Sequence, residues 1–112
     1  MKQGDIYYVS LDPVRGHEQS SERPVIVVSP RQYNDKTGLP YIAPITNGGD
    51  FATRRGLMVD LSGRCVKIQG GVRIDQVRPL DLKARKARFV ESAPASVVIE
   101  IIAKLGNIFS VE

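Results

Sequence analysis

The hydrophobic pattern of this chain changes its period once, near residue 94, and that change strongly limits the possible folds. Before it, β-branched and apolar residues come in short runs that end at Gly, Pro, Asn or Asp, as is typical of strands. The runs cover residues 5–12, 23–29, 39–45, 57–62 and 72–77, and a short strand is also expected after the basic 83–88 turn. After Pro94, apolar residues fall at helical spacing. They are Val97, Val98, Ile101, Ile102, Leu105, Ile108 and Phe109. We therefore predict a mostly β fold with α content: a small antiparallel β-barrel with a C-terminal helix packed on its sheet.

Three runs carry more specific predictions. Residues 23–29 are apolar without interruption, which is typical of a central strand buried on both faces or of a strand in a barrel wall. The prolines in residues 39–45 favour an edge strand or a bulge. Pro30 predicts a helical turn within the turn-rich residues 30–38.

Length and composition limit the architecture and the compartment. The chain has 112 residues, enough for one domain, 1–112, with a single core. No apolar run is long enough to span a bilayer, and the N-terminus lacks the pattern of a signal peptide. Cys65 is the only cysteine. We expect a cytoplasmic protein without disulfides and without association with a membrane.

The charge is unevenly distributed. Residues 51–90 contain ten Lys/Arg and three Asp/Glu, a net charge of +7, whereas residues 1–50 carry −1 and residues 91–112 carry −2. This basic block fits a polyanionic partner, and it fits equally well a basic surface that only faces solvent.

A pair of opposite charges lies in the run at 72–77. On a strand, Val72 and Ile74 would point into the core, and Arg73 and Asp75 would share the opposite face. From the residues alone, this pair is either a solvated ion pair or the working pair of a site.

The other candidate groups give weaker signals. His17, the only histidine, lies in a polar loop and is either a surface residue or one that contacts a substrate. The glycine pairs at 48–49 and 70–71 match no phosphate-binding fingerprint and are expected in turns or close to a ligand. The carboxylates are scattered, so we expect no metal site and no cofactor.

The sequence resembles the PemK/Kid and MazF toxins of bacterial toxin–antitoxin pairs. The resemblance rests on GDIYYVSLDPVRGHEQSSERPVIVVSP (4–30), PITNGGDF (44–51), VRIDQVRPLDLKAR (72–85) and the terminal helix, so it extends over essentially the whole chain. It is strongest to the PemK/Kid branch, which has His at the position of His17, where many MazF proteins have Ser.

The resemblance implies an SH3-like barrel and a homodimer that cuts single-stranded RNA at short sequences without metal. It assigns Asp75 as general base, Arg73 as proton donor and His17 as a group that stabilises the phosphate, and it gives catalytic importance to Arg23 and Thr46. Because the pKa of arginine exceeds about 12, we interpret Arg73 as an electrostatic stabiliser. The resemblance also implies residues that line an RNA groove, to which we add Arg55 from the basic block. These predicted RNA-binding residues are Asp5, Asn47, Arg55, Leu57, Gln69, Gly71 and Arg85.

The expected function is that of a metal-independent, sequence-specific endoribonuclease toxin that inhibits translation and growth. Attack by the 2′-hydroxyl would leave a 2′,3′-cyclic phosphate and a 5′-hydroxyl, and a cognate antitoxin would cover the basic groove. One alternative is a nucleic-acid-binding barrel without catalysis. Another is a gyrase poison of the CcdB type, whose activity depends on a Trp-containing tail, whereas this chain has no Trp.

Overall fold

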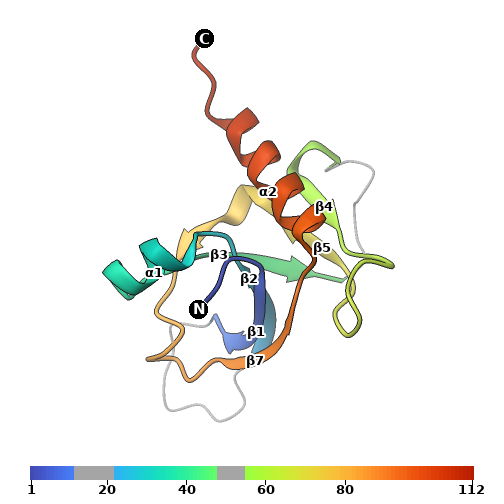
Figure 1. Ribbon diagram of the computed structural model, residues 1–112. Coiled ribbons are helices and arrows are strands. Elements are labelled where there is room, and N and C mark those ends of the chain that lie inside the picture. The colour runs from blue at the N-terminus through green and yellow to red at the C-terminus, as the bar shows by residue number, and fades with distance from the viewer. Residues whose placement is uncertain (12–21, 48–54) are drawn as a thin grey trace.

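The computed structural model describes residues 1–11, 22–47 and 55–112, and its elements follow the order that the sequence predicts (Figure 1). The strands are β1 (Asp5–Ser10), β2 (Glu22–Val27), β3 (Tyr41–Thr46), β4 (Met58–Asp60), β5 (Gly71–Arg73), β6 (Arg78–Pro79) and β7 (Arg88–Ser92). The helices are α1 (Arg31–Thr37), α2 (Ala95–Ile108) and two short 3-10 helices, η1 (Arg55–Leu57) and η2 (Ile74–Gln76).

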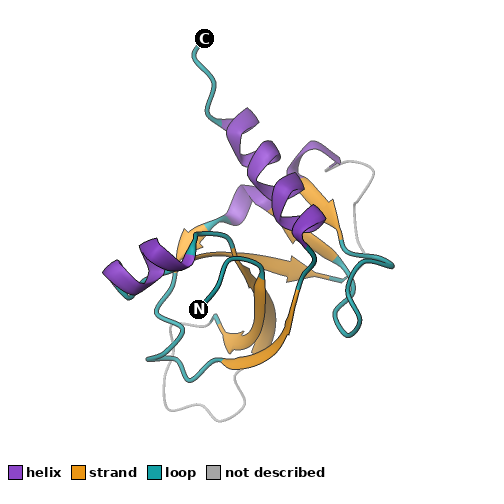
Figure 2. Ribbon diagram, in the orientation of Figure 1, coloured by secondary structure: helices purple, strands orange, loops and turns teal. Residues whose placement is uncertain are grey.

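The strands form one antiparallel sheet in the order β4-β5-β3-β2-β1-β7, and β6 also pairs with β3 (Figure 2). The predicted class, a mostly antiparallel β fold with a C-terminal helix, is confirmed. Within the described residues the strand pairing does not close into a full barrel, because the pairing path ends at β4 and β7.

Both faces of the sheet are buried, and this explains the continuous apolar run of β2. Ile26 packs on one face, and Val25 and Val27 pack on the other. The face of Ile26 carries a core that we call the helix-side cluster. It contains Ile6, Ile26, Val28, Ala43, Ile45, Val59, Leu61, Cys65, Ile68, Val72, Ile74, Val97 and Ile101. The opposite face carries Tyr7, Val9, Val25, Val27, Ile42, Leu80 and Leu82.

Helix α2 begins directly after Pro94, as predicted, and packs against β4 and η2 (Figure 1). Val97 and Ile101 are fully buried in the helix-side cluster. Further along the same stripe, Ile102 is 44% exposed and Phe109 is 80% exposed. The apolar face of α2 is therefore wider than the part that the sheet covers.

Of the two alternatives predicted for residues 39–45, an edge strand or a bulge, the edge strand is wrong. β3 pairs with β2 on one side, and with both β6 and β5 on the other. Ile42 pairs with β6 and Ile45 with β5, so Pro44 lies where the partner on that side is interrupted. Because proline has no N–H to donate, an interruption beside Pro44 loses no ladder bond from this residue.

The prediction of one strand over residues 72–77 is wrong, because the chain leaves the strand at this interruption. Strand β5 ends at Arg73, and the chain turns through η2 before β6 begins. Ile74 is still buried, as the alternation predicted. The helical turn predicted after Pro30 is confirmed and is longer than one turn, since α1 has seven residues and is capped by Gly38.

Candidate functional site

A polar pocket of about 470 Å³ lies where β2 and β3 meet the loop of residues 61–70. Four predicted site residues line it: Arg23, Thr46, Asn47 and Gln69. The remaining lining residues are Tyr8, Glu22, Pro24, Ile45, Lys67 and Ile68. We refer to this group as the polar pocket.

Strand geometry brings Arg23 and Thr46 to the same face of the sheet. Val25 pairs with Pro44 in an antiparallel ladder. Arg23 lies two residues before Val25, and Thr46 lies two residues after Pro44, so both are at the same end of this strand pair. Because side chains alternate along a strand, both residues project to the face of Val25. A cationic and a hydroxyl side chain therefore line one pocket, where they can bind a phosphate together.

Gly70 fixes the position of the 61–70 loop against β3. Its φ is +113°, and a Cβ at this position would collide with the carbonyl oxygen of Thr46. The N–H of Leu61 donates to the carbonyl of Gly70 at 2.8 Å and closes the loop at its base. Only glycine combines this backbone angle with so close an approach.

Arg73 and Asp75 form a two-pronged ion pair. Nε of Arg73 donates to Oδ1 of Asp75 at 3.0 Å, and Nη2 donates to Oδ2 at 2.9 Å. The pKa of Arg73 is raised from its ordinary value, first by the hydrogen bond to Asp75 and also by the negative charge of that carboxylate. Arg73 is therefore an even weaker acid than a free arginine and acts better as a fixed positive charge.

The strand register places Arg73 next to the polar pocket. Gly71 pairs with Thr46, and Arg73 is two residues along β5 from Gly71, so Thr46 and Arg73 project from the same face. Gly71 carries no side chain between them. Gly71 itself is buried, and Arg73 is half-buried.

Asp75 and Leu57 line a second, largely apolar hollow of about 560 Å³, which we call the apolar groove. One wall is helix α2, through Ile102, Leu105 and Ile108, followed by Phe109. Its other lining residues are Gln3, Val28, Ser29, Pro30, Tyr41, Ile74 and Val77. Most of the predicted site residues are thus divided between two hollows. Arg73 connects the two, because it lies next to Thr46 of the polar pocket and is bonded to Asp75 of the apolar groove.

Two other predicted RNA-binding residues lie outside both hollows. Asp5 is buried, and its carboxylate accepts hydrogen bonds from the N–H of Lys2 at 3.0 Å and from the hydroxyl of Ser92 at 2.7 Å. Arg85 donates to the carbonyl of Ser10 at 2.9 Å. Contact of either residue with RNA stays a prediction.

Two predictions fall outside what the structure describes. His17 belongs to residues 12–21, which are not described. Arg55 is described only through its backbone, as the first residue of η1.

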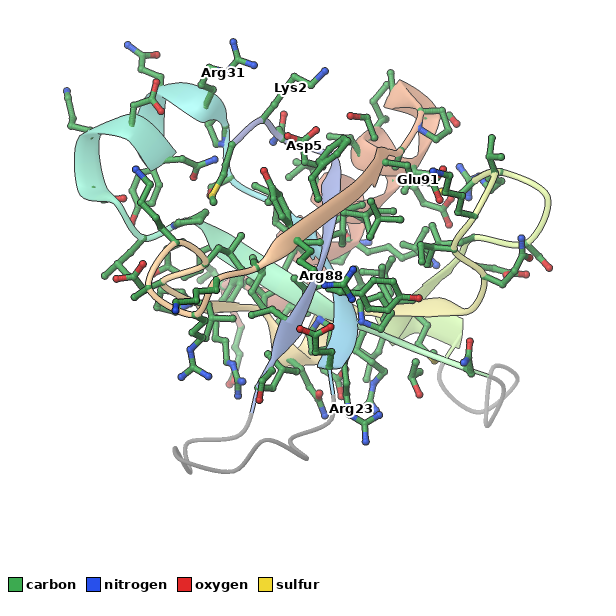
Figure 3. The ribbon with its side chains drawn as sticks, turned by 90° about the horizontal axis from the view of Figure 1, so that it is seen from below. Lys2, Asp5, Arg23, Arg31, Arg88 and Glu91 are labelled. Carbon is green, nitrogen blue, oxygen red and sulfur yellow. The ribbon has the colours of Figure 1, made fainter. Side chains whose placement is uncertain are left out.

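Sequence reasoning missed Tyr8, Glu22 and Lys67 as lining residues. Lys67 belongs to the basic block, and that block could have suggested it. Arg88 lies 5.5 Å from the centre of the Tyr8 ring and donates to Glu22 at 2.6 Å, which orders this side of the polar pocket. Figure 3 shows Arg88 of β7 and Arg23 of β2.

Neither a metal-binding cluster nor a membrane-spanning helix occurs in the part of the chain that the structure describes. Residues 1–11, 22–47 and 55–112 contain no group of three His, Cys, Asp or Glu placed to hold a metal ion. No helix in the same ranges is long and apolar enough to cross a membrane.

Comparison with known proteins shows the family of this chain. Residues 2–109 match the family model described as the PemK-like, MazF-like toxin of type II toxin–antitoxin systems. The chain is 42% identical to the endoribonuclease PemK of Escherichia coli over 110 residues, which are 98% of this chain and 83% of that protein. It is 40% identical to the endoribonuclease toxin ChpB of Escherichia coli K12 over 93% of this chain and 90% of that protein.

Solved structures agree as well. A chain of the MazE-MazF crystal structure (Form-II) from Deinococcus radiodurans superposes with a TM-score of 0.81 at 33% identity, covering 96% of this chain and 94% of that one. The sequence pattern, the sheet with its C-terminal helix and the match over nearly the full length lead to one assignment. The chain belongs to the PemK-like, MazF-like family of toxins of type II toxin–antitoxin systems.

Proposed function

We propose that this protein is a toxin that cleaves single-stranded RNA at specific short sequences in the bacterial cytoplasm, without metal. Membership of the toxin family and identity to proteins named endoribonucleases support the RNA-cleaving activity. The observation that carries the mechanism is the pair of Arg73 and Asp75, held beside a pocket lined by cationic residues.

The proposed reaction begins at the 2′-hydroxyl of the nucleotide on the 5′ side of the cut. Asp75 takes the hydroxyl proton, and the oxygen attacks the adjacent phosphorus in line. The new bond joins the 2′-oxygen to phosphorus, and the bond from phosphorus to the 5′-oxygen breaks. The products are a 2′,3′-cyclic phosphate and a 5′-hydroxyl. The leaving 5′-oxygen takes its proton from a water molecule, and the proton held by Asp75 then passes to the hydroxide that this leaves.

Arg73 supplies charge in this reaction. Two of the five N–H donors of a guanidinium bind Asp75, so others remain for a phosphate oxygen. A fixed positive charge stabilises the extra negative charge of the transition state. We assign the same electrostatic role to His17, as the family resemblance implies.

Arg23 and Thr46 act in this proposal from the polar pocket. Arg23 binds the phosphate, and Thr46 donates its hydroxyl to the same group or to the one beside it. The RNA backbone then runs from the polar pocket toward Arg73 and Asp75. The two sets of residues thus form parts of one site along a single face of β3 and β5.

The proposed assembly is a homodimer that a cognate antitoxin neutralises. The α2 wall of the apolar groove supports the dimer, since its Ile102, Ile108 and Phe109 are exposed and apolar. The polar pocket and the basic block offer the surface for an acidic or apolar antitoxin segment. A precedent for such a pair is the solved complex of MazE and MazF from Deinococcus radiodurans.

The proposed function is tested by incubating the purified protein with a long RNA in EDTA and mapping the ends of the fragments. We expect cuts at one short sequence, with 5′-hydroxyl and cyclic phosphate ends. A single-stranded DNA of the same sequence should stay intact, because it lacks the nucleophile. Binding of RNA without any cut would overturn the proposal and favour a binding protein without catalysis.

A further inference from the structure

Glu91 of β7 binds three consecutive backbone N–H groups of the 61–70 loop. Its Oε1 accepts from Val66 at 3.1 Å, and its Oε2 accepts from Lys67 at 2.9 Å and from Ile68 at 2.7 Å. One carboxylate therefore holds the middle of a loop that contains no strand or helix. Figure 3 shows Glu91 beside this loop.

A β-bulge directs Glu91 toward the loop. Ile6 of β1 pairs with Glu91, and the next residue of β1, Tyr7, pairs with Phe89, so Val90 is an extra residue in β7. Regular pairing beyond Tyr7 would place Val90 opposite Ile6 instead. Bulges commonly re-aim a side chain in this way. Glu91 is thereby turned to the face of Ile6, where Ile68 of the loop is also buried.

The loop segment that Glu91 holds is one wall of the polar pocket. Lys67, Ile68 and Gln69 line the pocket together with Arg23. The next residue, Gly70, lies against the carbonyl of Thr46. The wall is therefore fixed at two points: Glu91 holds its middle, and Gly70 holds its end.

Lys67 and Gln69 carry the chemistry that an RNA strand would meet there. A lysine ammonium binds phosphate without reading sequence, whereas a glutamine amide can donate to and accept from the edge of a base. The position of Gln69 relative to Arg23 thus affects which base fits when the phosphate is bound.

We propose that Glu91 is a positioning residue that holds Lys67 and Gln69 at the polar pocket and thereby sets which RNA sequence is cut. This inference rests on the proposed function. Glu91 reaches the RNA only through the backbone of the loop.

The test compares Glu91→Ala, Glu91→Gln, Gln69→Ala and the wild type on one RNA that contains the preferred sequence and single-base variants of it. We expect Glu91→Ala to lower the ratio of kcat/KM between preferred and variant sequences by about tenfold, the size of one lost hydrogen bond to a base. Glu91→Gln should have a smaller effect, because its single amide oxygen can still accept from Lys67 and Ile68. The double variant Glu91→Ala/Gln69→Ala should differ little from Gln69→Ala alone, since both changes act through one contact.

Amide hydrogen exchange gives a readout that does not depend on RNA. In Glu91→Ala the amides of Val66, Lys67 and Ile68 should exchange faster, while those of β2 and β3 keep their rates. Glu112→Gln removes the same charge from an exposed residue at the end of the chain and serves as the control.

Unchanged selectivity in a folded Glu91→Ala variant would overturn the inference. If that variant does not fold, unchanged selectivity in Glu91→Gln together with faster exchange of the three amides would overturn it. A wild-type protein that cuts no RNA would instead overturn the proposed function, so the two failures are distinguishable.

Discussion

The guanidinium of Arg73 donates to both carboxylate oxygens of Asp75, although the two residues belong to different elements. Arg73 is the last residue of β5, and Asp75 lies in the 3-10 turn that follows. Ile74 between them is buried in the helix-side cluster and holds the turn in place. Both charged groups are therefore presented from a fixed backbone, which is the arrangement that a catalytic pair needs.

Asp75→Asn keeps the size of the side chain and removes the proposed base. We expect RNA binding to persist and cleavage to fall on the order of 10²-fold or more, the usual contribution of a positioned general base. Single-turnover cleavage and binding of an uncleavable RNA measure the two effects separately. Asp35→Asn, an exposed aspartate of α1, is the matched control and should cut normally. Near wild-type cleavage by Asp75→Asn would shift the assignment to Arg23 and Thr46.

The salt dependence of RNA binding tests whether Arg23 binds phosphate. For a single strand, the slope of log K against log salt changes by about 0.7 for each phosphate contact. Arg23→Ala should reduce the slope by about this amount. Arg31→Ala removes the same charge from α1, on the other side of the molecule in Figure 3, and should leave the slope unchanged. Equal slopes for all three proteins would show that Arg23 does not contact the phosphate.

The sequence predicts the elements better than it predicts how they meet. The alternation at Val72 and Ile74 correctly predicts which residues are buried, because burial depends on the local pattern. The end of β5 at Arg73 depends on where β3 changes its partner from β6 to β5, and that is a contact between distant segments. The prediction of an edge strand from Pro44 failed for the same reason. Proline shows that one ladder bond is missing, but the sequence does not show whether the whole neighbouring strand is absent or only interrupted.

In the candidate site too, single residues could be predicted, but contacts between distant segments could not. The family resemblance pointed to Arg23, Thr46, Asn47 and Gln69, which line one pocket. The role of Glu91 was not predicted, because it depends on a bulge in β7 and on a loop that lies 23 to 25 residues away in the sequence. Neither feature leaves a local signature.

Gly70→Ala should both destabilise the protein and impair cleavage. At φ +113° an alanine is strained, and its Cβ would collide with the backbone of Thr46. Gly63→Ala is the matched control, because Gly63 also has a positive φ, +72°, but has open space around it. We expect Gly63→Ala to lower the free energy of unfolding by about 1–2 kcal/mol and Gly70→Ala to lower it by more. Equal losses, measured by urea denaturation, would show that the contact with Thr46 is unimportant.

The apolar groove is tested by a charge on helix α2. Ile102→Glu places a carboxylate on the α2 wall of the groove, and a second copy packed on this wall would then have to bury that charge. We expect a shift from dimer to monomer in sedimentation at micromolar concentration. Ile99→Glu introduces the same charge on the same helix at a residue that is 68% exposed and does not line the groove. A dimer that persists in Ile102→Glu would place the interface elsewhere.

A 2′-deoxy substitution in the RNA tests which oxygen attacks the phosphorus. Asp75 beside a phosphate could activate either a water molecule or the 2′-hydroxyl of the RNA. The 2′-hydroxyl is already attached next to the phosphorus, so its attack avoids the entropy cost of recruiting a second molecule. An RNA with one 2′-deoxy nucleotide directly 5′ of the cut should bind about as well as the parent and remain uncut. The same substitution one nucleotide away should restore cutting at least in part, which controls for changes in the shape of the RNA. Efficient cleavage of the first RNA, with a plain 3′-phosphate on the product, would show that water attacks and that Asp75 acts on water.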